Sequence, residues 1–487
     1  MSDSSSPKPD RRERGERTER GERADPLRLQ AALRTVSTTV SQRISGRVSE
    51  LTGLVLRATA PGARIGELVA IDRLNEPTED EPQLRSLPSW RRGAASETPL
   101  YAEVVGFRGE EVILLPLGSV AGVGPNSVVR PTGMPLTILT GTPLLGRVVD
   151  AYGEAIDDGP PLSSLTAELI PTPVEREAPL PLRRRRITEA LPFGLRAIDG
   201  CLTIGQGQRL GLFAGPGLGK STLLGQIARN ASSDVTVIGL IGERGREVRD
   251  FIDRELDEET RRRTVVVCAT SDQPPLLRLK AALSATAIAE HFRDRGKKVL
   301  LLVDSLTRVA RAQREVGLAA GELPARQGYP PSVFALLPRL VERTGQGEFG
   351  SITAVYAVLV TGAGDDVDDI IAEEVRATLD GHIELSRSLA ERGHYPAIDV
   401  LRSLSRVMED IVEAPQRQAA ARLRELLSLS ERQRDLVLLG AYQRGSDPAT
   451  DEALHKLPAI EEFLRQGRYE RSELAETRRK LQALISS

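Results

Sequence analysis

One short segment constrains the fold more than any other part of the chain: Ala214–Thr222, which reads AGPGLGKST. An apolar run, Gln208–Phe213, precedes it, and a stretch with helical character, Leu223–Arg229, follows it. A strand that turns through glycines into a helix is the context in which this pattern cradles phosphate oxygens with backbone N–H groups. The usual pattern begins with glycine, and Ala214 stands in that place. The sequence therefore predicts a P-loop.

The side chains of this loop suit a nucleoside triphosphate with a divalent cation. Lys220 is expected to reach the β- and γ-phosphates, and the Ser221 hydroxyl is expected to bind Mg²⁺. ATP and Mg²⁺ are thus the predicted cofactors. The predicted nucleotide-binding residues are Gly215, Pro216, Gly217, Leu218, Gly219, Lys220, Ser221 and Thr222.

Apolar runs alternate with helical stretches from about Phe193 onward. This alternation is typical of a mostly parallel sheet flanked by helices, and we predict an α/β core of the RecA-like P-loop class. The predicted strands are Arg209–Ala214, Val235–Ile241, Thr264–Ala269, Val299–Asp304 and Ser351–Val360.

Acidic residues follow two of these strands. Asp304 ends a buried run, so we expect it beside the P-loop, where it would hold Mg²⁺ through the water shell of the ion. A helix N-cap is the alternative for Asp304, because Ser305 and a helical stretch come next. Glu243 and Glu247 lie just after Val235–Ile241, and either carboxylate is a candidate for polarising the attacking water. A solvated loop charge is the alternative for both.

The chain is predicted to hold four parts. Residues 1–25 form a charged tail that repeats RGER, and its composition predicts disorder. Residues 26–120 form a helix and a β-barrel, 121–410 the ATPase domain with a linker at 151–190, and 411–487 a C-terminal helical domain. The first helix is placed at about Leu27–Val48. The barrel strands are placed at Thr52–Thr59, Glu67–Ile71, Ala102–Phe107 and Glu111–Leu115, with a surface insertion at Asn75–Pro99 that carries Trp90.

Composition narrows the functional classes. The net charge is −2 and aromatic residues make up 3% of 487, which argues against a polycation or a base-stacking surface made for nucleic acid. We interpret the arginine run Arg183–Arg186 as part of a solvated linker. Cys201 and Cys268 are expected to be reduced, partly buried thiols. No signal peptide and no apolar run of the ~20 residues that span a bilayer are found.

Several motifs together resemble the ATPases of type III protein secretion systems, the injectisome and flagellar export enzymes. They appear in order between residues 242 and 406, and the likeness covers roughly residues 28–470. The motifs are Gly242–Val248, Asp304–Arg308, Gly328–Phe334, Leu379–Ile383, Gly393–Asp399 and Ser403–Arg406. That family is similar to the catalytic subunit of rotary ATP synthases.

The resemblance implies roles that the residues alone do not. Glu243 would orient the hydrolytic water, Arg244 would pair with acidic neighbours, and Tyr395 would lie against the adenine ring. Arg406 would act as an arginine finger in the site of a neighbouring subunit, with Arg376 as the rival for that role. The catalytic residues implied are thus Lys220, Glu243, Arg244 and Arg406.

The resemblance also implies partners and a location. It implies a homo-oligomeric, hexameric ring, with a central stalk protein meeting Arg311–Gly321. It further implies a regulator or stator protein, chaperone–substrate complexes, and a cytoplasmic place at the inner face of the membrane through the export apparatus. Asp365–Glu374 and His394–Met408 favour the injectisome modestly, without deciding against the flagellum.

Three other functions share the predicted fold. A helicase of the transcription-termination-factor type would need exposed aromatic residues on the barrel. The aromatic residues in 48–117 are mainly Tyr101 and Phe107. A rotary proton-pump subunit is disfavoured by the export-type motifs. A non-catalytic nucleotide-binding scaffold is disfavoured by Glu243.

Overall fold

A computed structural model describes residues 45–73, 99–360, 370–439 and 441–486. The predicted tail 1–25, most of the helix Leu27–Val48, nearly all of the insertion Asn75–Pro99 and the start of Asp365–Glu374 lie outside these ranges. Where the predicted helix is described, the prediction is wrong. Gly46–Thr52 is the strand β1, and Val48 is buried in the core of a barrel rather than on a helix face.

The first part of the described chain is a closed barrel of six strands, in the order β1-β2-β5-β4-β3-β6. Alternate residues point inward, so Leu56, Val69 and Leu114 are fully buried. The predicted small β-barrel is confirmed. Its sixth strand lies after residue 120, where the sequence placed the end of this domain. The strands are β1 Gly46–Thr52, β2 Val55–Thr59, β3 Glu67–Ile71, β4 Leu100–Arg108, β5 Glu111–Pro116 and β6 Val128–Pro135.

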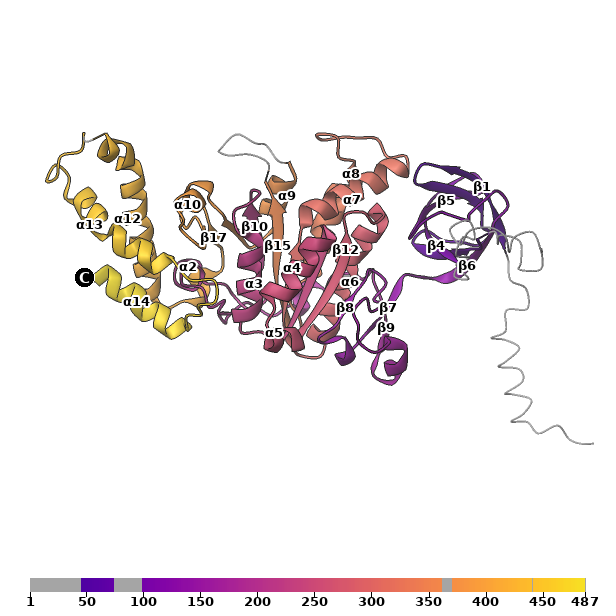
Figure 1. The fold of residues 1–487 in the computed structure, drawn as a ribbon, viewed down its shortest axis with the longest axis horizontal. Helices are drawn as coiled ribbons and strands as arrows, with labels where there is room; N and C mark the ends of the chain where they lie inside the picture. The colour runs from indigo at the N-terminus through magenta and orange to yellow at the C-terminus, as the bar shows by residue number, and fades with distance from the viewer. Residues whose placement is uncertain (1–44, 74–98, 361–369, 440, 487) are drawn as a thin grey trace, which may run out of the picture. The chain divides into compact units, whose positions relative to one another are not determined.

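The core of the chain is a mostly parallel sheet in the order β17-β16-β10-β15-β13-β11-β12-β8 (Figure 1). The short strand β14 pairs with β15 outside this order. The predicted α/β P-loop core is confirmed. A separate two-stranded sheet pairs β7 with β9. These strands are β7 Thr137–Thr140, β8 Val148–Val149, β9 Ile170–Pro173, β10 Arg209–Ala214, β11 Val235–Glu243, β12 Thr264–Thr270, β13 Lys298–Asp304, β14 Gly345–Gln346, β15 Ser351–Leu359, β16 Gly381–Glu384 and β17 Leu404–Ser405.

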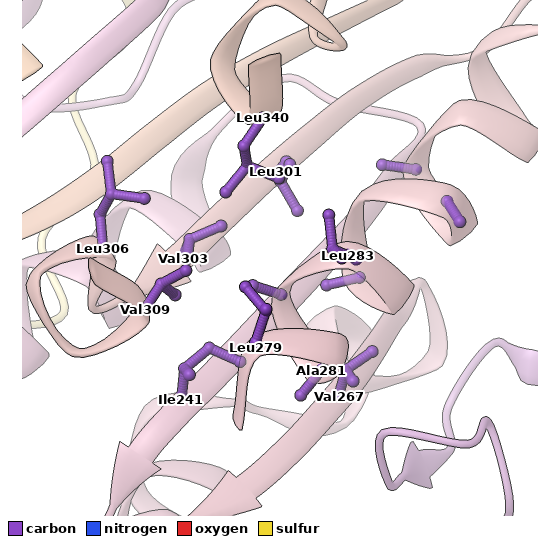
Figure 2. Close-up of a cluster of buried hydrophobic side chains, with 14 of the residues drawn as sticks. Ile241, Val267, Leu279, Ala281, Leu283, Leu301, Val303, Leu306, Val309 and Leu340 are labelled. Atoms are coloured by element: carbon purple, nitrogen blue, oxygen red, sulfur yellow. The ribbon is translucent and has the colours of Figure 1, made fainter. Parts of the chain in front are cut away.

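Both faces of the sheet are covered, which explains why its strands read as continuous apolar runs. In β13, Leu301 and Val303 belong to one hydrophobic cluster, whereas Leu300 and Leu302 belong to another. Figure 2 shows the first cluster, in which side chains of β13 meet Leu279 and Leu283 of a helix that crosses the sheet. The sheet is therefore held from both sides, and the carboxyl ends of its strands form a fixed edge.

Helices α3 to α9 connect the strands of the core, and α12, α13 and α14 form the C-terminal helical domain that was predicted. In that domain α12 contacts both α13 and α14, and α14 contacts α2. The α-helices of the described residues are α2 Arg196–Cys201, α3 Lys220–Asn230, α4 Gly245–Glu255, α5 Glu258–Arg262, α6 Pro275–Arg293, α7 Leu306–Ala319, α8 Pro331–Glu342, α9 Ile370–Thr378, α10 Arg387–Glu391, α11 Met408–Ile411, α12 Ala414–Leu438, α13 Pro448–Leu464 and α14 Leu474–Ser486.

The arginine run in the predicted linker does more than face solvent. Arg184 donates hydrogen bonds to the Thr344 and Glu342 carbonyls at the end of α8, and Arg185 donates to the Phe349 carbonyl. Arg183 and Arg186 remain exposed. Two members of the run thus attach this segment to the core.

Both cysteines, Cys201 and Cys268, are free thiols and fully buried rather than partly so. Among the helices that the structure describes, none combines the length and the hydrophobicity needed to cross a membrane.

Candidate active site

The P-loop joins β10 to α3 at the carboxyl edge of the sheet. Gly217 and Gly219 have φ values of 79° and 87°, a left-handed conformation that glycine adopts without strain. Gly219 is the N-cap of α3, and no side chain caps this helix. The first N–H groups of α3 are therefore left for an anion, as the helix dipole also favours.

Three charged side chains from different elements meet beside this loop. The Lys220 ammonium, at the start of α3, contacts the Asp304 carboxylate at the end of β13, and it lies 3.5 Å from Glu243 Oε1. Glu243 ends β11, the strand next to β13, and the ladder pairs Leu240 with Asp304. Asp304 and Glu243 are 3% and 8% exposed. The helix-cap alternative for Asp304 does not apply, because Ser305 takes the N-cap position of α7.

Glu243 is the more perturbed of the two acidic candidates on this loop. Burial, together with the nearby Asp304 carboxylate, raises the pKa of Glu243 to about 7. A hydrogen bond between the two side chains lowers the pKa of Glu247, because Glu247 accepts the proton that Glu243 holds. Glu243 thus lies against the P-loop lysine, and Glu247 lies behind it on α4.

Arg308, which was not predicted to belong to the site, completes this group. Its guanidinium donates to the Gly242 carbonyl and to Glu243 Oε2 at 3.0 Å, so it holds the Glu243 carboxylate from the side of α7. Arg308 lies within the Asp304–Arg308 motif. Its contact with Glu243 could not be predicted, because the two residues are far apart in the sequence. Arg244 is largely exposed and contacts Glu247 Oε1 at 3.0 Å.

A cavity of about 280 Å³ opens on the other side of the P-loop. Its walls include Leu218, Thr222 and Leu223 from the P-loop and α3, Tyr395 from the loop after α10, and Gln466 and Arg468 from the segment between α13 and α14. Tyr395 is 48% exposed. A Cβ built on Gly219 would lie 3.7 Å from the Tyr395 ring, so the ring lies directly against the P-loop. The sequence did not point to Gln466 or Arg468.

Arg406 and Arg376 differ in their surroundings. Arg406 follows β17, the edge strand of the sheet, and is exposed. In the described parts of the chain, its side chain forms no hydrogen bond or ion pair. Arg376, on α9, contacts Glu384 at 3.3 Å and lies 4.5 Å from the centroid of the Phe213 ring. Arg376 is therefore engaged within its own subunit, and Arg406 is not.

The donor set fits Mg²⁺ bound together with a triphosphate. Mg²⁺ prefers oxygen ligands and is usually held by one or two protein groups plus substrate phosphates, not by an all-protein cage. The Ser221 hydroxyl and the Asp304 carboxylate supply such oxygens. No group of three or more His, Cys, Asp or Glu side chains in the described ranges could hold a metal alone. The Lys220 ammonium lies beside the Asp304 and Glu243 carboxylates, so this position already holds a positive charge.

A parallel sheet with a P-loop, a carboxylate on a nearby strand and a second buried carboxylate defines an ATP-binding domain of the P-loop class. Comparisons with known families agree with this class. Residues 194–405 match the nucleotide-binding domain of the ATP synthase alpha/beta family, and residues 48–133 match the beta-barrel domain of that family. Residues 412–483 match the T3SS EscN ATPase C-terminal domain.

Whole proteins match over nearly their full length. The flagellum-specific ATP synthase of Bacillus subtilis is 46% identical over 451 residues, 93% of this chain and 97% of that protein. The type 3 secretion system ATPase of Pseudomonas savastanoi pv. phaseolicola is 48% identical over 437 residues, 89% of this chain and 92% of that protein.

A solved structure agrees as well. The assembled ATPase EscN from the enteropathogenic E. coli type III secretion system superposes with a TM-score of 0.80 at 41% identity, over 90% of this chain and all of that chain. EscN in complex with its central stalk EscO gives a TM-score of 0.78. The chain therefore belongs to the ATP synthase alpha/beta family, in the group of type III secretion and flagellum-specific ATPases.

Proposed function

We propose that this chain hydrolyses ATP in a homo-oligomeric ring, most simply a hexamer, and that the hydrolysis energises type III protein export. The observation that carries the proposal is the meeting of Lys220, Asp304 and Glu243 beside an uncapped P-loop helix. A loop that only bound nucleotide would need no buried carboxylate with a raised pKa beside it, as Glu243 is here.

Each residue of this group has a proposed task. The P-loop residues Gly215, Pro216, Gly217, Leu218 and Gly219, with Thr222, cradle the phosphates, and Lys220 binds the β- and γ-phosphate oxygens. Ser221 and Asp304 hold Mg²⁺, which neutralises charge on the phosphate oxygens when it is bound. The neighbouring cavity accepts the adenine, with the Tyr395 ring against the base.

Glu243 orients the water that attacks the γ-phosphate. This role needs the ionised carboxylate, and Arg308 favours that form by its hydrogen bond of 3.0 Å to Oε2. Arg244 directly follows Glu243 at the start of α4, and its guanidinium pairs with Glu247 at 3.0 Å. In this proposal Arg308 and Arg244 position the carboxylate, and Glu243 contacts the reacting water.

Arg406 supplies positive charge to the active site of a neighbouring subunit. Its exposure, its place after an edge strand and its lack of partners in the described chain all favour it over Arg376, which is engaged with Glu384 and Phe213. An arginine supplied in trans stabilises the charge of the phosphoryl-transfer transition state by ~10³–10⁵ in rate, or roughly 4–7 kcal/mol.

The export role implies further contacts. A central stalk protein, as EscO is for EscN, would meet Arg311–Gly321, which here is the second half of α7 and its C-terminal turn. We propose that the ring releases chaperones from secretion substrates and unfolds these substrates. We also propose that a regulator or stator protein holds it at the cytoplasmic face of the membrane.

Hydrolysis assays on the purified chain test this function. ATP turnover should require Mg²⁺, should be abolished by Lys220→Ala, and should fall at least a hundredfold in Glu243→Ala. Stimulation of about tenfold or more by single-stranded RNA would instead identify a helicase. Full turnover in Glu243→Ala would show that another group orients the water. Absence of turnover in every condition would leave a nucleotide-binding scaffold.

A further inference from the structure

The segment that joins α13 to α14, residues 465–473, crosses the P-loop helix α3 and is fastened to it. Gln226 on α3 donates to the Gly467 carbonyl at 3.0 Å. One turn later, Arg229 donates to the Arg468 carbonyl at 2.9 Å. We call residues 465–473 the α13–α14 loop. Its backbone therefore follows any displacement of α3.

This loop is also a wall of the base cavity. Gln466, Arg468 and Tyr395 all line the cavity, and the Gln466 backbone N–H donates to the Tyr395 carbonyl at 2.9 Å. A base that fills the cavity would thus contact both the loop and the Tyr395 ring.

Arg468 reaches past the cavity to a buried carboxylate. Its guanidinium contacts Glu255, which is the last residue of α4 and 5% exposed. Arg229 contacts the same carboxylate at 3.0 Å, and both arginines lie over the ring of Tyr469. Glu255 is therefore the point at which α3, α4 and the α13–α14 loop meet.

The packing around this carboxylate is close. A Cβ added to Gly225 on α3 would lie 2.5 Å from the Cβ of Glu255, so only glycine allows α4 to approach α3 in this way. The hydrogen bonds to Glu255 cannot shift without moving one of the two helices.

The other end of α4 lies at the catalytic carboxylate. The helix spans 11 residues, or about 16 Å at 1.5 Å per residue, and is short enough to move as one body. Its N-cap, Arg244, directly follows Glu243, the last residue of β11. The contacts thus run without a break from the base cavity through Arg468, Glu255 and α4 to Glu243.

We propose that Glu255 is a positioning residue that couples occupation of the base cavity to the placement of Glu243. The inference rests on the proposed function, because it assigns Glu243 to the attacking water. A bound base holds the α13–α14 loop, the loop holds Glu255 through Arg468, and α4 then holds the end of β11 that carries Glu243. Glu255 does not line the cavity, so its effect is on turnover rather than on nucleotide affinity.

Two variants and one control test the coupling in the full-length protein. Glu255→Gln keeps the shape of the side chain and removes its charge, and Arg468→Gln removes the partner at the more exposed end of the pair. Glu258→Gln is the matched control, because Glu258 lies only three residues after Glu255 and forms an exposed ion pair with Arg262. The wild type, the two single variants, their double variant and the control are all measured for kcat and KM with Mg²⁺ and ATP. Hydrogen exchange of α4 is followed with and without adenylyl imidodiphosphate.

We expect Glu255→Gln to lower kcat about tenfold, within the usual range of coupling between sites, with KM little changed. Arg468→Gln should lower kcat similarly and also raise KM, because Arg468 lines the cavity. The double variant should be no slower than the slower single variant, since both break one chain of contacts. The nucleotide should slow exchange in α4 in the wild-type and Glu258→Gln proteins but not in Glu255→Gln.

Equal protection of α4 in Glu255→Gln and wild type, or additive losses of kcat in the double variant, would overturn the inference. A Glu255→Gln protein that loses P-loop protection by the nucleotide as well would show a general structural role and would also overturn it. Failure of the proposed function would look different, because the wild-type protein itself would then not hydrolyse ATP.

Discussion

Glu243 has a cation on each side and a carboxylate behind it. Lys220 lies 3.5 Å from one carboxylate oxygen and Arg308 lies 3.0 Å from the other, while burial and Asp304 oppose its ionisation. The balance places the pKa of Glu243 at about 7. A group poised in this range changes its protonation state under ordinary assay conditions.

The first prediction concerns pH. Since the ionised carboxylate is the active form, kcat/KM for ATP should rise with pH and reach half of its plateau near pH 7, the pKa of Glu243 in the free protein. Arg308→Ala removes a charge that lowers this pKa, so the midpoint should move to higher pH. Lys297→Ala, at an exposed position, serves as the control. An unchanged midpoint in Arg308→Ala would contradict the assignment.

The raised pKa of Glu243 also makes the stability of the fold depend on pH, and stability changes in the opposite direction to activity. The folded-state pKa of about 7 exceeds the ordinary value of 4.5, so between these values the folded protein binds more protons than the unfolded chain. The stabilising contribution is fully present below pH 4.5 and is lost as the pH rises through 7. Activity and stability therefore change in opposite senses with the ionisation of this one residue.

At the scale of elements, α6 and the barrel are joined by a buried ion cluster. Lys280 on α6 is 2% exposed and lies 2.5 Å from Glu103 on β4 and 2.6 Å from Glu175. Burial raises the pKa of Glu103, and Lys280 opposes that shift. A buried carboxylate of this kind is tolerated only while its cation is present.

The second prediction follows from this cluster. Lys280→Met should lower the free energy of unfolding by about 3–5 kcal/mol at pH 8, because Glu103 is left as an uncompensated buried charge. The loss should shrink at low pH, where Glu103 is neutral, and Glu103→Leu in the same chain should restore much of it. Urea denaturation followed by circular dichroism measures these changes. Lys298→Met is the control, since the exposed pair of Lys298 with Glu189 contributes little.

The elements of the core could be predicted because buried parallel strands are continuous apolar runs. The predicted runs Arg209–Ala214 and Val299–Asp304 agree with β10 and β13 to within one residue. Two barrel strands were missed. β6 contains Pro131, Gly133 and Pro135, residues that indicate turns. They lie in the second half of the strand, where its register with β3 shifts.

The candidate site could be predicted only where residues follow a strand or a motif directly. Glu243 and Asp304 stand at or just after the carboxyl end of a predicted strand, where parallel strands bring side chains together, and Lys220 lies in the motif that follows such a strand. Arg308, Glu255 and Arg468 act across contacts between elements distant in sequence. Such contacts depend on helix packing, which neither composition nor periodicity specifies.

At the scale of the whole molecule, one chain lacks part of its proposed site. Arg406 stands at the edge of the sheet, without a partner in the described parts of its own chain. The third prediction is that specific ATPase activity rises with protein concentration as rings assemble. Arg406→Ala should leave assembly unchanged and lower activity ~10³-fold or more at every concentration. Light scattering beside the activity assay measures both, and activity independent of concentration would contradict a shared site.

The most direct test of a shared site mixes two inactive proteins. Lys220→Ala has no working P-loop but supplies Arg406, whereas Arg406→Ala has a working P-loop but supplies no arginine. In rings assembled from equal amounts, about one interface in four joins the intact half of each. We predict that the mixture hydrolyses ATP well above the sum of the two separate proteins, while Lys220→Ala mixed with Glu243→Ala, two variants defective in the same half of the site, does not. A mixture no more active than its parts would contradict the account.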